Sequence, residues 1–199
     1  MIEVRPITNK HIDSVVTIHL DAFKGFFLTE LGEDFLYTYY DSVRKNDRGL
    51  LLGCFEDDKL LGFCASTKLS AGFNSYLVKK NLIQFIKNGF LLLFKKPLAL
   101  VHISKNFTKL SSNCSDDGKY AELLSIAVST SAQGKGIGKI LLSHLELVLR
   151  EMNIELLSLT TDYNDNDKTL KFYNSLDYEV LYDFIAYPER KMYRLIKKL

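Results

Sequence analysis

The chain has 199 residues, of which 47% are hydrophobic and 25% are charged. This length predicts one domain, here residues 1–199, and this composition excludes an intrinsically disordered chain, a collagen-like fibre and a small disulfide scaffold. The net charge of +2 is too near neutrality for a general nucleic-acid binder, so we expect no nucleic-acid partner.

Hydrophobic periodicity predicts strands and helices that alternate along the chain. Strands are expected at residues 2–6, 50–55, 60–67, 120–128, 154–160, 178–187 and 192–196. Helices are expected after Thr8, a suitable N-cap, and at residues 34–44, 139–152 and 165–176, with a loop at 25–32. This order predicts an α/β fold in which helices flank a mixed, mostly antiparallel sheet.

The helix expected at 139–152 has an amphipathic pattern. Its apolar face is expected to comprise Ile140, Leu141, His144, Leu145, Val148, Leu149 and Met152. The opposite, polar face is expected to carry Lys139, Ser143, Glu146 and Arg150.

The cysteines and the N-terminal residues give information about the cellular compartment in which the protein is expected. Cys54, Cys64 and Cys114 lack the CxxC spacing typical of zinc sites, and their odd number argues against a disulfide framework. We therefore expect free thiols in a reducing compartment, the cytoplasm, and no metal. The first residues lack the basic and apolar segments of a secretory signal, and no run of 18 apolar residues predicts a membrane span.

A basic block extends from Lys68 to Lys109. It contains eight lysines and no aspartate or glutamate, so the rest of the chain holds 18 of the 26 basic residues and all 24 acidic ones. Apolar residues recur with helical spacing from Tyr76 to Phe90, which predicts one or two amphipathic helices ended by Pro97. We expect an insertion over about 68–118. It is either a helical hairpin packed on the core or a lid that meets an anionic substrate or an anionic membrane surface.

A glycine-rich segment, Gln133–Gly138, joins the strand at 120–128 to the next helix. Gly134, Gly136 and Gly138 permit a tight turn and a close approach of the backbone to a ligand. The free N–H groups at a helix N-terminus attract phosphate oxygens, so a pyrophosphate is the natural ligand. The spacing matches neither a P-loop, since Ile140 stands where Ser or Thr is needed, nor a GxGxxG fingerprint, since Lys139 replaces the third glycine.

Three segments together, Glu122–Val128, Gln133–Gly138 and Asn166–Tyr178, resemble the GNAT superfamily of acyl-CoA-dependent N-acetyltransferases. The family signature is a [QR]xxGxG loop after a strand, followed about 30 residues later by an Asn-x-x-Ala-x-x-Phe-Tyr-x-x-x-Gly-Phe helix. The resemblance is strongest over 120–180, and the strand order extends it over most of the chain. It implies the GNAT fold, with the basic insertion between the third and fourth strands.

The resemblance also implies how acetyl-CoA is bound. The backbone of one strand segment would pair with the pantetheine arm, and an N–H near its end would face the thioester oxygen, where negative charge develops during attack. A helix residue would contact the same arm, and the glycine-rich loop would hold the pyrophosphate. The residues implied are Ile126, Ala127 and Val128 on the strand, Asn166 on the helix, and Gln133, Gly134, Lys135, Gly136, Ile137 and Gly138 in the loop.

The resemblance assigns catalytic roles to two side chains. Tyr173 matches the tyrosine that protonates the departing thiolate, although a packed aromatic would give the same pattern. Glu122 lies six residues before Val128, where the histone-acetylating branch carries its catalytic glutamate. A carboxylate in an otherwise apolar strand suits a general base, whereas a strand-end glutamate in solvent is the structural alternative. Weaker candidates for the base are Asp162, Asp165 and His19, the last of which also suits a structural role.

Three positions depart from the family pattern. Thr130 replaces a common proline and Thr169 replaces the usual alanine, and both are small changes. Asp177 replaces the usual glycine before the aromatic residue, which puts the local turn in doubt.

The expected function is transfer of an acetyl group from acetyl-CoA to a primary amine of a small molecule, with an amino-sugar as one candidate, by direct attack. The alternatives are acetylation of a protein N-terminus or lysine, and a catalytically silent acyl-CoA-binding module. Peripheral membrane contact through the basic insertion is a further hypothesis. For the oligomeric state, both a monomer and a homodimer are compatible with the sequence.

Overall fold

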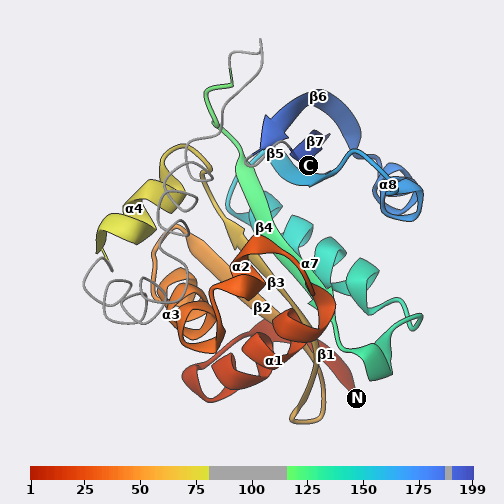
Figure 1. Ribbon diagram of the computed structural model, residues 1–199. Helices are drawn as coiled ribbons and strands as arrows, with labels where there is room; N and C mark the ends of the chain where they lie inside the picture. The colour runs from red at the N-terminus through yellow and green to blue at the C-terminus, as the bar shows by residue number, and fades with distance from the viewer. Residues whose placement is uncertain (81–115, 187–189) are drawn as a thin grey trace.

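The computed structural model describes residues 1–80, 116–186 and 190–199. Its strands form one seven-stranded sheet in the order β1-β2-β3-β4-β5-β7-β6 (Figure 1). β4 and β5 pair in parallel and every other neighbouring pair is antiparallel, which confirms the predicted mixed, mostly antiparallel sheet. The strands are β1 (Ile2–Pro6), β2 (Gly49–Glu56), β3 (Lys59–Thr67), β4 (Ala121–Val128), β5 (Leu156–Asp162), β6 (Glu179–Ala186) and β7 (Arg190–Lys198).

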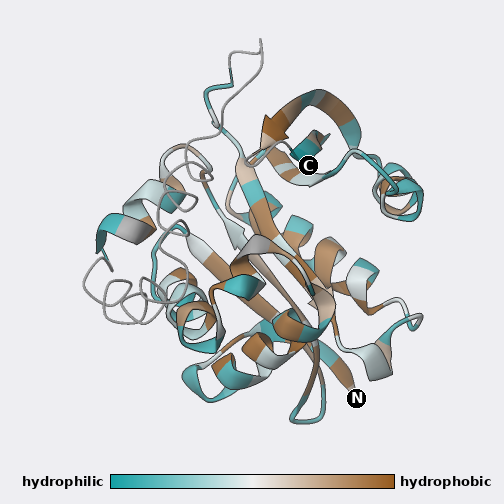
Figure 2. Ribbon diagram, in the orientation of Figure 1, coloured by the Kyte–Doolittle hydropathy of each residue, from teal (hydrophilic) through white to brown (hydrophobic). Residues whose placement is uncertain are grey.

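Helices cover both faces of the sheet. α1 and α3 bury their apolar residues in one core against the sheet, and α7 and α8 contribute to a second core. Figure 2 shows largely hydrophobic central strands and helices with hydrophilic bands. The α-helices are α1 (Ile12–Ala22), α2 (Phe27–Glu30), α3 (Glu33–Arg44), α4 (Phe73–Lys80), α7 (Ile137–Glu151) and α8 (Asp167–Asn174), and two 3₁₀ turns are η1 (Asn9–His11) and η2 (Thr130–Ala132).

The long helix α7 is rotated relative to the predicted face. Ile140 and Met152, expected to be buried, are 39% and 42% exposed, whereas Leu142 is buried. Glu146, expected on the polar face, is 6% exposed. Its carboxylate accepts hydrogen bonds from the Tyr178 hydroxyl at 3.0 Å and the Lys197 ammonium at 2.8 Å. Polar partners from β7 and the residue before β6 therefore bring a charged residue into the interface, which a hydrophobic pattern cannot predict.

Two further expectations differ in detail from the structure. The segment 25–32, predicted as a loop, contains the short helix α2. Thr8 precedes the turn η1, and α1 begins only at Ile12. Of the helices predicted in the basic block, α4 is helical, and the remainder up to residue 115 lies outside the described residues.

The two ends of the insertion meet where the chain leaves β3 and returns to β4. The N–H of Ser70 donates to the carbonyl of Tyr120 at 2.8 Å, and the N–H of Ala71 donates to the carbonyl of Gly118 at 3.1 Å. These bonds close the base of the insertion beside the sheet.

Asp177 adopts the conformation that the family pattern gives to glycine. Its φ of +65° is left-handed, and the N–H of Tyr178 returns to the carbonyl of Tyr173 at 3.1 Å. A non-glycine residue is strained there, so Asp177→Gly should raise the free energy of unfolding by about 0.5–1 kcal/mol in urea titrations. Asp21→Gly, within helix α1, should lower it instead. A loss of stability in Asp177→Gly would contradict the strain argument.

Candidate active site

The sheet opens between β4 and β5. Their pairing covers only three residue pairs and ends at Leu123 and Leu159. On its other edge β4 shifts register against β3 around Leu124, between the pairs Ser66–Leu123 and Ala65–Ser125. A bulge bends the strand that carries it. The later parts of β4 and β5 therefore diverge.

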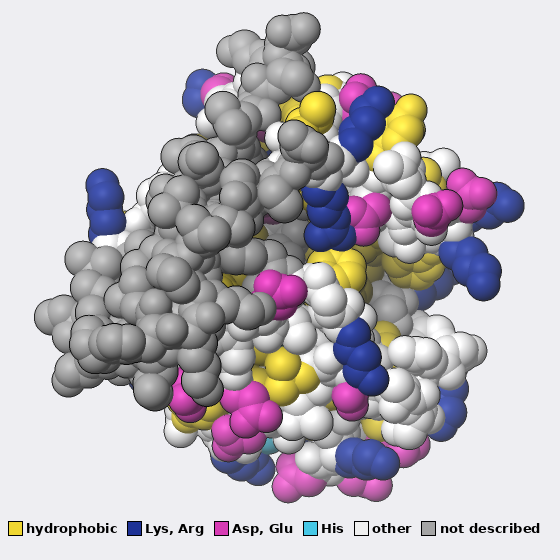
Figure 3. All heavy atoms as spheres, in the orientation of Figure 1, with side chains coloured by type: hydrophobic (Ala, Val, Ile, Leu, Met, Phe, Trp, Pro, Cys, Tyr) yellow, Lys and Arg dark blue, Asp and Glu magenta, His cyan; other side chains and the backbone are white. Residues whose placement is uncertain are grey.

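A cavity of about 640 Å³ occupies this opening. Residues from α1 and α2, β4, β5, α8 and the β6–β7 pair line it. On the face shown in Figure 3, hydrophobic side chains reach the surface near the middle of the described part, between basic and acidic ones. Six of the predicted cofactor-binding and catalytic residues line the cavity, as do two of the weaker candidates for the base. The six are Ile126, Ala127, Val128, Gly138, Asn166 and Tyr173, and the two are His19 and Asp162.

The glycine-rich loop forms the N-terminus of α7. Gly134 and Gly136 have φ values of +76° and +77°, and Gly136 is the residue that precedes the first turn of the helix. Gln133, Gly134, Lys135 and Gly136 are exposed, and Ile137 is buried beneath them. The first N–H groups of a helix lack intrahelical partners and attract anions, and binding of a pyrophosphate by this loop stays a prediction.

Gly136→Ala should weaken coenzyme A binding about tenfold, a change of about 1.4 kcal/mol in binding free energy. The new Cβ would strain a left-handed residue and would enter open space beside the loop, since no heavy atom lies within 4 Å. Gly72→Ala is the matched control, because Gly72 has φ +68° and the same open space but lies in the insertion. Isothermal titration calorimetry with coenzyme A measures both. Equal affinities for the two variants would contradict a role for the loop.

Gly62 on β3 is a residue that the sequence reasoning missed. A Cβ there would lie 2.7 Å from the carbonyl oxygen of Ala127 and 3.2 Å from Cα of Val128. This glycine therefore lets β3 lie close behind the part of β4 that lines the cavity. A glycine inside an apolar strand was the available signal.

Asn166 joins the end of β5 to the start of α8. Its side-chain amide donates to the Thr161 hydroxyl at 2.6 Å and to the carbonyl of Asp162 at 2.8 Å. Both bonds hold Asn166 at the cavity wall, where contact with a cofactor arm stays a prediction.

Tyr173 lies on α8 with its ring packed against Phe172 and Tyr178. Its side chain is buried and lines the cavity, and its hydroxyl has no hydrogen-bond partner among the described residues. Burial raises the pKa of Tyr173 well above its usual value, so the phenol keeps its proton at neutral pH. A protonated hydroxyl at a cavity wall can donate a proton to a departing thiolate.

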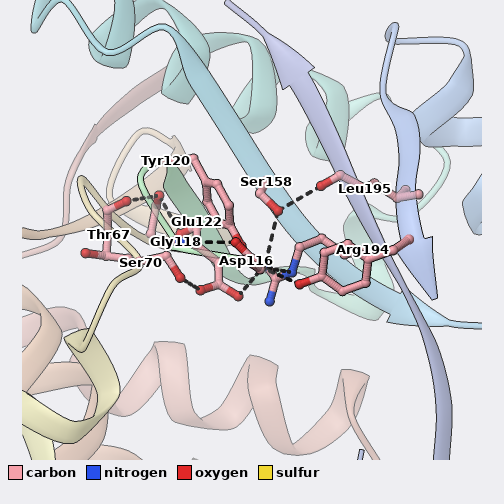
Figure 4. Close-up of polar contacts among 11 residues, drawn as sticks. Thr67, Ser70, Asp116, Gly118, Tyr120, Glu122, Ser158, Arg194 and Leu195 are labelled. Carbon is pink, nitrogen blue, oxygen red and sulfur yellow. Dashed lines mark hydrogen bonds and ion pairs between the residues drawn. The ribbon is translucent and has the colours of Figure 1, made fainter. Parts of the chain in front are cut away.

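Glu122 lies in a buried network rather than at the cavity wall (Figure 4). One carboxylate oxygen is 3.1 Å from Nη1 of Arg194, and the other accepts a hydrogen bond from the Ser70 hydroxyl. The same guanidinium nitrogen donates to the Ser158 hydroxyl at 3.0 Å. These contacts support an anchoring role that joins β4, β5, β7 and the base of the insertion, and the catalytic role of Glu122 stays a prediction.

Arg194, which the sequence reasoning missed, is the centre of this network. Its side chain is 0% exposed, and its Nε lies 3.5 Å from a carboxylate oxygen of Asp116. That carboxylate also accepts hydrogen bonds from the hydroxyls of Tyr120 and Tyr182. Arg194 is the one charged residue of the strand expected at 192–196, and this signal does not identify its partners.

The weaker candidates for the base lie in different surroundings. Asp162 lines the cavity and forms a bidentate ion pair with Arg190, whose guanidinium carbon lies 4.5 Å from the ring centroid of Phe26. Asp165 is exposed in the turn before α8. His19 is buried and lines the cavity. Among residues 1–80, 116–186 and 190–199, no three His, Cys, Asp or Glu side chains form a metal-binding cluster.

Comparison with known proteins identifies the family. The profile of the acetyltransferase (GNAT) family matches residues 12–178, most of the chain. The chain belongs to the GNAT acetyltransferase family. It is therefore an acetyl-CoA-dependent acetyltransferase. A search of curated protein sequences found no match.

Solved structures share the GNAT fold at low sequence identity. The ribosomal-protein-S18-alanine N-acetyltransferase of Escherichia coli is 14% identical, with a TM-score of 0.64 over 100% of this chain and 94% of that one. The PaiA N-acetyltransferase of Thermoplasma acidophilum, solved in complex with coenzyme A, is 16% identical, with a TM-score of 0.56 over 100% and 99%. The ribosomal-protein-alanine N-acetyltransferase of Brucella melitensis is 14% identical, with a TM-score of 0.63 over 99% of both chains. These likenesses support the GNAT fold for this chain.

Within the described part of this GNAT acetyltransferase, no helix has the length and hydrophobicity needed to cross a bilayer.

Proposed function

We propose that this enzyme transfers an acetyl group from acetyl-CoA to a primary amine of a small molecule, with an amino-sugar as one candidate acceptor. The observation that carries the proposal is one cavity that brings together the diverging end of β4, the first turn of α7 and Tyr173. The loop Gln133–Gly138 would hold the pyrophosphate, and Ile126–Val128 would pair with the pantetheine arm. Asn166 would contact that arm. Acetyl-CoA is a co-substrate and no metal takes part in the proposed reaction.

In the proposed reaction the amine nitrogen attacks the thioester carbonyl directly. A backbone N–H near Val128 would stabilise the oxyanion that forms. The carbon–sulfur bond then breaks, and Tyr173 donates its proton to the departing thiolate. Glu122 is the base that the family resemblance predicts, and Glu122→Gln tests that role.

Direct transfer is supported by the two described cysteines, which offer no accessible nucleophile. Cys54 and Cys64 are both free and buried. Burial raises the pKa of the Cys64 thiol to about 12, so the thiolate needed for an acyl-enzyme is scarce at neutral pH. The free thiols also support the proposed cytoplasmic location.

A protein N-terminus is the rival acceptor. Two of the similar structures are ribosomal-protein-alanine N-acetyltransferases, although their identities of 14% establish only a common fold. A lysine side chain is a related alternative. A contribution of the basic insertion to acceptor binding or to membrane contact concerns residues that lie mostly outside the described ranges.

Thiol release from acetyl-CoA, measured with parallel panels of small amines and short peptides, tests the proposal. We expect coenzyme A binding and turnover on at least one small amine, with mass spectrometry showing an added acetyl group on that amine. Turnover on peptides alone would favour the rival acceptor. Binding without turnover on either panel would favour the silent module.

A further inference from the structure

A buried histidine on α1 lies at the cavity without a role in the chemistry described above. His19 is 3% exposed and lines the cavity together with Phe23, Phe26 and Leu28. The ring centroids of His19 and Phe23 are 4.7 Å apart. A buried polar ring in such an apolar wall normally has a hydrogen-bond partner.

That hydrogen bond comes from α3. Nδ1 of His19 is 2.7 Å from the hydroxyl of Tyr40, which is fully buried. The Tyr40 hydroxyl is in turn 3.0 Å from the hydroxyl of Ser125, a residue of β4 that also lines the cavity. A chain of hydrogen bonds therefore links the His19 imidazole on α1, through the Tyr40 hydroxyl on α3, to the Ser125 hydroxyl on β4.

The other ring nitrogen has no such partner. Nε2 of His19 is buried and makes no hydrogen bond among the described residues. If Nε2 carried the proton, a buried donor would be left without an acceptor, which is costly and rare in native proteins. The favoured arrangement has Nδ1–H donating to the Tyr40 oxygen and the Tyr40 hydroxyl donating to Ser125. Nε2 then presents a lone pair.

The placement of His19 also suits a base that works opposite an acid. α1 packs in the core on one face of the sheet, whereas Tyr173 belongs to the core on the other face. Both residues line the same cavity. The attacking nitrogen and the leaving sulfur occupy different positions around the carbonyl carbon. A group that accepts a proton from the nitrogen and a group that donates one to the sulfur can therefore lie on different sides of the cavity.

We propose that Nε2 of His19 accepts the proton of the attacking amine, and that Tyr40 is a positioning residue that fixes the required tautomer. The inference rests on the proposed function. As the nitrogen–carbon bond forms, the carbonyl π electrons move to the oxygen and the attacking nitrogen becomes positively charged. Nε2 then takes a proton from that nitrogen, which leaves the nitrogen neutral. Collapse of the oxyanion breaks the carbon–sulfur bond, and Tyr173 protonates the thiolate. After product release, solvent returns a proton from His19 to Tyr173.

The charges around the cavity are consistent with this role. Burial lowers the pKa of His19 to about 4, so the ring is neutral and its lone pair is available at neutral pH. Asp162, the described carboxylate in the cavity lining, is held by Arg190. Glu122 is held by Arg194 outside that lining.

The tautomer is the first test, and it needs no knowledge of the acceptor. Long-range ¹H–¹⁵N NMR of the full chain, assigned with His19→Gln, should show Nδ1 protonated and Nε2 unprotonated at neutral pH. Tyr40→Phe should shift these signals, because the ring loses its partner. A ring protonated at Nε2 in the wild-type enzyme, with coenzyme A binding intact, would overturn this inference alone. Absence of coenzyme A binding would instead overturn the proposed function.

Kinetics on the amine turned over fastest give the second test. His19→Gln should lower kcat about 10²- to 10⁴-fold, the usual contribution of a general base, while coenzyme A affinity is unchanged. His11→Gln is the matched control, because His11 is also buried with an unpartnered Nε2, is held by Thr8, and does not line the cavity. Added imidazole should restore part of the activity of His19→Ala. Equal kcat values for His19→Gln and wild type would overturn the inference.

Discussion

Tyr173→Phe should lower kcat for acetyl transfer about 10²- to 10⁴-fold while coenzyme A binding stays within a factor of about three. The substitution removes only the hydroxyl, and that hydroxyl has no hydrogen bond among the described residues that its loss would break. The thiolate would then leave without a positioned acid. Steady-state thiol release, together with calorimetry for coenzyme A, measures both quantities.

Tyr178→Phe provides the control for this substitution. Tyr178 packs against Tyr173 and is equally buried, but its hydroxyl donates to Glu146 instead of facing the cavity. We expect this variant to lose about 1–3 kcal/mol of stability through the lost hydrogen bond and to keep its kcat. If Tyr173→Phe retained the wild-type rate across the pH range, Tyr173 would not be the general acid.

Arg194→Met should destabilise the fold by about 3–5 kcal/mol, because it leaves the buried carboxylate of Glu122 without its counter-ion. The loss should appear as a lower denaturation midpoint in urea followed by circular dichroism. The double variant Glu122→Gln with Arg194→Met should recover part of it, since no uncompensated charge then remains on β4. A loss below about 1 kcal/mol in Arg194→Met would contradict the importance of this pair.

Glu122→Gln alone separates the two roles considered for this residue. If Glu122 anchors Arg194, stability should fall while kcat of the folded enzyme changes by less than about threefold, and this is the result we expect. If Glu122 is the general base, kcat should fall by about 10²-fold or more at normal stability. The second result would restore the assignment predicted from the family resemblance and would remove the proton acceptor role from His19.

Local pattern was enough to predict most of the fold. Strands and helices followed from hydrophobic periodicity, and their order implied a mixed sheet. The pattern failed where polar partners from distant segments changed burial. Glu146 is buried because Tyr178 and Lys197 satisfy its carboxylate, and neither partner lies near it in sequence. The short helix α2 was missed because four residues make about one helical turn, which is too short for apolar residues to recur with helical spacing.

The candidate site was predictable to the extent that it lies in contiguous motifs. The glycine loop and Tyr173 each belong to a short segment with a recognisable spacing. The networks around Glu122 and His19 were not predictable in this way. Glu122 and Arg194 are 72 residues apart, and Tyr40 and Ser125 are 85 residues apart. Their pairing depends on strand order and helix packing, which sequence spacing does not encode.

The closed base of the insertion has a consequence for the evolution of this enzyme. Hydrogen bonds between residues 70–71 and 118–120 close the connection where the chain leaves β3 and returns to β4. The strands of the catalytic fold therefore impose no length on the segment between those residues. Lengthening a loop costs little, about 0.6 kcal/mol for each doubling. In related enzymes this segment could therefore be replaced by one of another length or sequence. The acceptor specificity would then change while the residues that bind acetyl-CoA stay the same.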